Sequence, residues 1–169
     1  MGESDHHQAD SNAIEKVDGN FLLAPRAFDI PWGKDYWRIP PETKVGEPAA
    51  QSSSLKWIEL SSSVTVVPGK KYRISFRLGF EPDAYGYEGT PVFLMAKIGK
   101  TGRHSWKRLK KLEKVPRGPI DTPDDNDPFE IEVPSSEVSD PTIHFGIYET
   151  CAWNSKKGLL LYSASVKEV

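Results

Sequence analysis

The 169-residue chain has little of what disulfide-bonded, metal-binding or membrane-spanning proteins need. Its single cysteine, Cys151, has no partner for an intramolecular disulfide, and no cysteine and histidine residues have the spacing of a zinc site. No apolar run is long enough to cross a bilayer. The net charge of −2 argues against a surface devoted wholly to nucleic acid or anionic membrane. These absences predict a globular domain without metal, cofactor or membrane insertion.

Signals for secretion and motifs for catalysis are missing as well. The N-terminus lacks the apolar segment of a secretory signal, and no N-x-S/T sequon occurs, which predicts a cytoplasmic or nuclear protein. There is no P-loop, no G-x-G-x-x-G, no G-x-S-x-G and no H-E-x-x-H. Four acids, Asp35, Glu81, Glu88 and Glu149, are candidates for a glycosidase carboxylate pair, but nothing in the sequence selects two of them. We therefore predict a protein that is not an enzyme.

The first 20 residues are polar and almost free of aromatic side chains. Such a segment buries too little apolar surface to offset the entropy of ordering, so we expect residues 1–20 to be a flexible tail before a domain over residues 21–169. His6 and His7, beside Asp5 and Asp10, are possible metal ligands, although adjacent histidines in a flexible segment more often have no such role.

The rest of the chain shows the period of two that is typical of strands. Tyr72–Leu78 and Phe129–Val133 alternate apolar and polar residues, as expected for strands with one buried face. Four other segments are apolar on both faces or nearly so and predict inner strands: Leu55–Leu60, Pro91–Ile98, Thr142–Glu149 and Gly158–Val166. With fourteen prolines and thirteen glycines between strands, this pattern favours an all-β, antiparallel, jelly-roll-like β-sandwich. Trp57, within one of these strands, is expected in the core.

Opposite charges cluster in two successive segments. Residues 103–117 hold seven Lys or Arg and one Glu, and residues 121–137 hold seven acids and no base. Either the two segments are neighbours that neutralise each other, or they form one polarised surface. The run from Arg103 to Lys114 also resembles a nuclear-import patch, and Trp106 within it is placed to stack on a nucleic-acid base. Such runs are also common on solvated strands.

Aromatic residues are densest between Asp29 and Pro40, where the sequence reads D-I-P-W-G-K-D-Y-W-R-I-P. The order I-x-W-G-x-D-x-Y-W resembles the opening motif of the plant phloem protein 2 family and its Nictaba-type lectins. Further landmarks of that family follow in order across residues 24–168: Trp57-Ile58-Glu59, Pro68 to Phe76, Ala84 to Tyr87, Pro91-Val92, Phe145, Tyr148-Glu149, Trp153 and Lys157-Gly158-Leu159.

The resemblance implies a β-sandwich lectin of the cytoplasm, nucleus or phloem sap that acts in plant stress, defence or the phloem. Its ligands would be N-acetylglucosamine oligomers, N-glycan cores and the glycoproteins that carry them. The resemblance also implies a homodimer as one possible state. It places the sugar site on Trp32, Trp37, Glu149 and one C-terminal lysine, Lys156 or Lys157, with Trp153 beside them.

The chemistry of these residues suits a sugar, which offers an apolar C–H face and a ring of hydroxyl groups. A tryptophan supplies the plane, Glu149 accepts hydrogen bonds, and a lysine, Tyr36 or Asn154 donates them. From the residues alone, a core position is an almost equal alternative for Trp32, Trp37 and Trp153. A second functional class also stays open, namely an adaptor of the same fold that binds protein or, weakly, RNA through the basic Arg103–Lys114 face.

Overall fold

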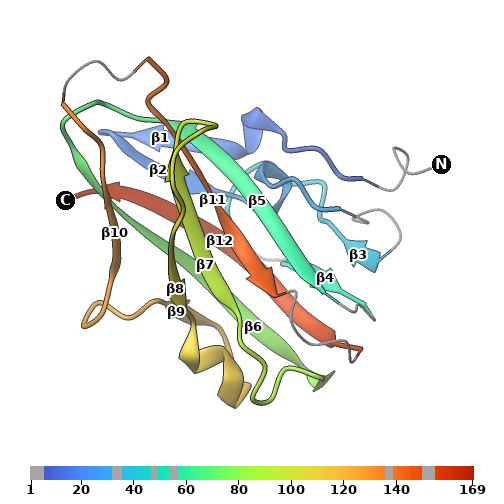
Figure 1. Ribbon diagram of the computed structural model, residues 1–169. Coiled ribbons are helices and arrows are strands. Elements are labelled where there is room, and N and C mark those ends of the chain that lie inside the picture. Colours follow the sequence, from blue (N-terminus) through green and yellow to red (C-terminus); the bar gives the residue numbers. More distant parts are fainter. Residues whose placement is uncertain (1–5, 32–35, 47–48, 54–56, 136–138, 150–154) are drawn as a thin grey trace.

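A computed structural model describes the protein over residues 6–31, 36–46, 49–53, 57–135, 139–149 and 155–169. Two sheets lie face to face, and every strand pair within these residues is antiparallel (Figure 1). The fold is therefore the antiparallel β-sandwich that the sequence predicts. No helix within the described residues has the length and apolar character that a membrane crossing requires.

Within the described residues, the larger sheet has eight strands built around the long pair β6 and β12. One edge of β12 pairs with β2 and then with β4, and its other edge pairs with β6, which also pairs with β9 and β10. The strands are β1 (Ile14–Val17), β2 (Asn20–Leu23), β3 (Trp37–Arg38), β4 (Ala50–Ser52), β6 (Lys71–Tyr85), β9 (Ile120–Thr122), β10 (Phe129–Glu132) and β12 (Lys157–Glu168).

The smaller sheet has four strands in the order β5-β11-β7-β8, and Figure 1 shows it layered over β6 and β12. Short 3₁₀ helices lie before β1, between β2 and β3, and between β8 and β9. The strands are β5 (Ile58–Thr65), β7 (Phe93–Ile98), β8 (Ser105–Arg108) and β11 (Thr142–Glu149), and the 3₁₀ helices are η1 (Ser11–Ala13), η2 (Pro25–Ala27) and η3 (Lys110–Lys114).

The core lies between the sheets and has an aromatic centre. The rings of Phe28, Phe76 and Phe145 come from the chain after η2, from the larger sheet and from the smaller sheet, and their centroids are 5.7–6.1 Å apart. All three are almost completely buried. Tilted and edge-to-face contacts of this kind add to the free energy gained from apolar burial, so the three rings join the two layers.

The structure corrects the predicted end of the N-terminal tail. Residues 14–17 form β1, which pairs with β2 at the edge of the larger sheet, and Ala13 is buried. Earlier still, the backbone N–H of His7 donates to the carbonyl of Ile30 over 3.0 Å, and the His7 ring is buried. Backbone pairing thus orders a segment whose side chains bury little apolar surface, a contribution that composition does not reveal.

The expectation that Trp57 lies in the core is wrong, since its side chain is 40% exposed. Side chains alternate along β5, where Ile58 and Leu60 point into the core. Trp57 therefore shares the outward direction of Glu59. Because residues 57 and 58 are both apolar, the sequence predicted a strand buried on both faces. Only the face that carries Ile58 is buried.

The other predicted strands are confirmed, with ends that shift by at most two residues except in β6, which runs from Lys71 to Tyr85 and so continues seven residues beyond the predicted end at Leu78. They correspond to β6, β7, β10, β11 and β12, and the segment predicted over 55–60 corresponds to β5, which runs on to Thr65. Six further strands in the described residues were not predicted, and none of them exceeds four residues: β1, β2, β3, β4, β8 and β9. Strands this short carry too few alternations to be recognised.

Candidate functional site

An ion pair joins the ends of β11 and β12 inside the sandwich. Glu149 is the last residue of β11, and Lys156 directly precedes β12. The Lys156 Nζ atom lies 2.8 Å from Oε2 of Glu149, and neither side chain has measurable solvent exposure. Of the two lysines left open by the sequence, the structure brings Lys156 to the acid.

Lys157 points the other way. Successive side chains of a strand alternate between its faces, so an inward Lys156 requires an outward Lys157. The Lys157 Nζ atom donates to Oδ2 of Asp83 over 2.7 Å at the surface. This hydrogen bond, together with the lysine charge, lowers the pKa of Asp83 below its ordinary value.

Several side chains and one glycine from other strands surround the buried pair. Gly86, just after β6, permits the closest approach, because a Cβ atom there would lie 2.3 Å from the Ser155 carbonyl oxygen and 2.8 Å from Cα of Lys156. Its φ of +89° also favours glycine. Next to it, Tyr87 is buried, and burial and the nearby Glu149 carboxylate raise its pKa.

Ser52 and Trp37 belong to the same end of the larger sheet. They face each other in the β3–β4 register, and both are buried. The Ser52 hydroxyl accepts the backbone N–H of Leu159 over 3.0 Å, which ties β4 to β12 just beyond Lys156. Trp37 packs with the core cluster, so the structure gives it the core position that the sequence left open.

A gain in the free energy of folding does not explain why this ion pair is buried. Removing two charges from water costs several kcal/mol per ion, and replacing such a pair with apolar residues is often neutral or stabilising. A buried ion pair is better attested as a device that fixes one arrangement of the chain. What it fixes here is the separation between the two ends of the connection from Glu149 to Lys156.

Two of the predicted site residues, Trp32 and Trp153, lie outside the described residues, and so does Asp35. Trp153 is carried by the connection whose ends are Glu149 and Lys156. Sequence analysis missed Tyr87 as a neighbour of the pair. The family landmark from Ala84 to Tyr87 contained the information needed to find it, because Tyr87 follows the glycine that makes room for Lys156.

Of the candidate metal ligands at the N-terminus, Asp5 lies outside the described residues. Within the described residues no group of three or more histidine, cysteine, aspartate or glutamate side chains is placed to hold a metal ion. His7 instead hydrogen-bonds the Phe28 carbonyl through Nδ1 over 2.9 Å, and burial is the main cause of its lowered pKa. His6 lies 3.7 Å from Asp29.

The basic and acidic segments are neighbours that neutralise each other. Lys107 pairs with Asp127 over 2.7 Å, and Lys111 pairs with Asp124. Within the basic segment, Arg108 binds Glu113 with two hydrogen bonds of 2.7 Å. The structure therefore shows neighbouring segments with paired charges rather than one polarised surface. Much of the positive charge on this face is neutralised by acids of the same chain.

Comparison with known proteins agrees with the landmarks in the sequence. The family model for phloem protein 2 matches residues 19–167. The protein PHLOEM PROTEIN 2-LIKE A9 of Arabidopsis thaliana is 38% identical over an alignment of 181 positions, which covers 99% of this chain and 98% of that protein.

Two solved structures illustrate a distant likeness. A mannanase of Podospora anserina with a family 35 carbohydrate-binding module has a TM-score of 0.48 at 10% identity, over 90% of this chain and 28% of that one. The first family 22 xylan-binding domain of Paenibacillus barcinonensis Xyn10C has a TM-score of 0.40 at 12% identity, over 96% and 90% of the two chains.

Proposed function

The chain belongs to the phloem protein 2 family, and we propose that it is a non-catalytic carbohydrate-binding protein whose ligands are oligomers of N-acetylglucosamine or N-glycan cores. The observation that carries the proposal is the buried pair of Glu149 and Lys156, because its position matches the acid and lysine of the motif. Both the acid and the lysine arise from the same end of the sandwich as Trp37.

In this proposal the tryptophans and the ion pair have different roles. Trp32 and Trp153 contact the apolar face of a sugar ring, as aromatic planes do in sugar sites. Glu149 and Lys156 are buried, so we assign them to holding the ends of the connection that carries Trp153. A connection with fixed ends loses less entropy when it binds, and this raises affinity without a new contact.

Titration calorimetry of the full chain with N-acetylglucosamine, its dimer and its trimer tests the function. We expect dissociation constants in the micromolar to millimolar range, about −8 to −4 kcal/mol, with the trimer bound more tightly than the monosaccharide. Absence of heat with all three sugars, together with no signal on an array of N-glycans, would refute the proposal.

Two matched variants test the role of the pair. The double variant E149Q/K156M removes both charges together, so it leaves no buried charge unpaired. We expect it to stay folded and to bind the trimer at least tenfold more weakly, while K157M, changed at the adjacent exposed lysine, binds like the parent. If the folded double variant binds like the parent, the pair has no part in sugar binding. Trp32→Ala should also weaken binding at least tenfold and leave thermal unfolding unchanged.

A further inference from the structure

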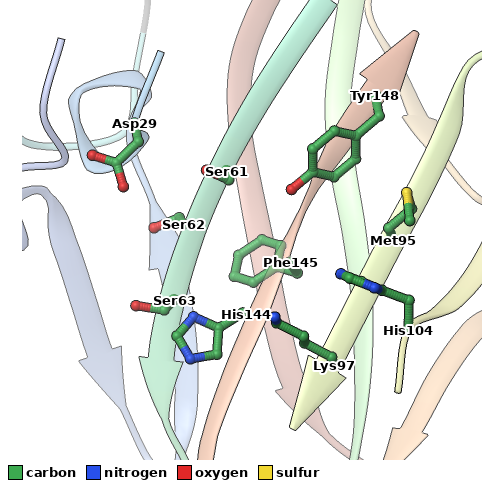
Figure 2. A pocket seen from close by; sticks show the side chains of 10 residues that line it. All are labelled: Asp29, Ser61, Ser62, Ser63, Met95, Lys97, His104, His144, Phe145 and Tyr148. Carbon is green, nitrogen blue, oxygen red and sulfur yellow. The ribbon is translucent and has the colours of Figure 1, made fainter. Parts of the chain in front are cut away.

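The outer face of the four-stranded sheet carries a polar groove that the site at Glu149 does not use. The groove has a volume of about 230 Å³. Figure 2 shows its lining side chains, among them Ser61 and Ser63 from β5, His144 and Tyr148 from β11, and His104 just before β8. Glu149 points to the opposite side of the same sheet, into the core, so the two places are separate.

The register of the sheet explains why this face is hollow. Trp106, Met95, Gly146 and Ser61 are successive partners across β8, β7, β11 and β5, and Asp29 extends the row through its bridge to Ser61. At the middle of this row Gly146 has no side chain. A Cβ atom there would lie 2.1 Å from the carbonyl oxygen of Leu60. This contact shows that the backbone of β5 lies against position 146, so no residue other than glycine fits there. The hollow itself lies beside this position, where the serine side chains of β5 are short and the larger side chains of His144, Tyr148 and Met95 surround them.

Those flanking side chains offer a mixture of hydrogen-bond donors and acceptors. His144 and Tyr148 border Gly146 along β11, because they are the next outward positions on the same strand. Serine hydroxyls and histidine rings both donate and accept, and the carboxylate of Asp29 accepts. Such a set matches a ligand that is itself rich in hydroxyl groups.

The charge around the groove excludes a strong preference for anions. Asp29, Glu59 and Asp140 are its nearby acids, and Lys97 and Lys100 are its nearby bases. The ammonium group of Lys97 is already bound to the Lys100 carbonyl over 2.7 Å. Burial lowers the pKa of His144, which keeps its ring neutral at pH 7. With acids and bases nearly balanced, a neutral polar ligand fits better than a phosphate or a polyanion.

An exposed aromatic platform lies at one end of the row. Trp106 is 63% exposed, and its ring packs edge-to-face on Phe93 with centroids 5.0 Å apart. Strands are spaced by about 4.8 Å, so the five positions from Trp106 to Asp29 span about 19 Å. The groove itself is smaller than the roughly 300–1,000 Å³ of sites for drug-sized ligands, which suits one sugar residue with its neighbours lying along the open row.

We propose that this outer face is a second carbohydrate-binding site, in which a neutral oligosaccharide lies across the strands with one sugar residue in the groove between Ser61 and His144 and another on Trp106. The site is independent of the one proposed at Glu149 and Lys156. A single chain with two sites would bind two glycans at once and cross-link multivalent glycans without forming an oligomer.

The test uses the full chain labelled with ¹⁵N and a panel of neutral tetrasaccharides, namely chitotetraose, cellotetraose, xylotetraose and mannotetraose. We expect at least one of them, at millimolar concentration, to shift the amide signals of Met95 and Gly146 and the indole signal of Trp106. Trp106→Ala should weaken this binding at least tenfold. Tyr85→Ala, which removes an aromatic side chain exposed on the other sheet, should not.

The variant E149Q/K156M separates the two sites. If the outer face binds on its own, this variant retains the shifts at Met95 and Gly146 even when its binding near Glu149 is lost. The proposal is overturned if no tetrasaccharide shifts these signals, or if inorganic phosphate or a heparin oligosaccharide shifts them and the neutral sugars do not. Loss of all outer-face shifts in the folded E149Q/K156M variant would also overturn it, since the two sites would then not be independent.

Discussion

The Nζ atom of Lys156 lies 2.8 Å from Oε2 of Glu149 in a part of the molecule closed to solvent. Each charge is tolerated there only because the other is present, since an unpaired buried charge is strongly destabilising. The two residues enclose a connection of six residues, so their contact links the stability of the sandwich to the placement of that connection.

Changing one partner of the pair should cost more than changing both. Lys156→Met leaves Glu149 buried without its counter-charge, and we expect a loss of about 3–5 kcal/mol in the free energy of unfolding. The double variant E149Q/K156M should lose at least about 1 kcal/mol less than Lys156→Met, because a buried neutral amide without its partner is less costly than a buried unpaired charge. Urea denaturation of the two variants and of K157M measures this. If K156M alone does not lower the free energy of unfolding, the pair is not closed to water in solution.

Replacing Trp37 should destabilise the protein more than replacing Trp57, although the sequence predicted a core position for Trp57. Trp37 is 7% exposed and Trp57 is 40% exposed. Trp37→Ala removes a large buried side chain and should destabilise the protein by about 3–5 kcal/mol. Trp57→Ala should cost less than Trp37→Ala by at least about 2 kcal/mol, because a large part of the Trp57 side chain is already in water. Thermal melts decide the order, and equal costs would contradict the exposed position of Trp57.

The stability of the protein should fall as the pH falls below the ordinary pKa of histidine. Burial lowers the pKa of His7, so the unfolded chain binds a proton at a higher pH than the folded chain does. The contribution of His7 to the free energy of unfolding is fully present above about pH 6.5. It declines as the pH falls from there toward the pKa of His7 in the folded state.

The variant His7→Asn measures this contribution, because asparagine can donate to the Phe28 carbonyl and does not titrate. The difference in unfolding free energy between parent and variant should be larger at pH 7.5 than at pH 5. Burial also lowers the pKa of His144, which adds a dependence of the same sign to both proteins and cancels in the difference. A difference that stays constant with pH would contradict a buried, neutral His7.

Removing the acids that cover the basic face should increase its affinity for nucleic acid. Asp124 and Asp127 neutralise Lys111 and Lys107, so we expect the parent to bind single-stranded RNA weakly and D124N/D127N to bind it more tightly. The gain should shrink as salt rises, with a slope in log affinity of about −0.7 for each phosphate contact. Fluorescence anisotropy with oligo-U over a salt series provides the measurement. If the variant binds no better than the parent, the adaptor hypothesis fails in its RNA form.

The sequence by itself determined the class of fold and the order of its longer strands. Alternation with a period of two needs only the local chain, since successive side chains point to opposite faces whatever the strand pairs with. The predicted segments Thr142–Glu149 and Gly158–Val166 therefore correspond to β11 and β12. The motif between Asp29 and Pro40, with the landmarks after it, was sufficient to indicate the family.

The tertiary structure decided which residues meet. Lys156 and Lys157 are adjacent and chemically equal in the sequence, and only the phase of β12 turns one toward Glu149 and the other toward Asp83. His7 and residues 14–17 are held by backbone hydrogen bonds to Ile30 and to β2, which depend on no side-chain pattern. The row from Trp106 to Asp29 draws on four strands and a bridge far apart in the chain, and their register is set by non-local pairing that a local pattern does not contain.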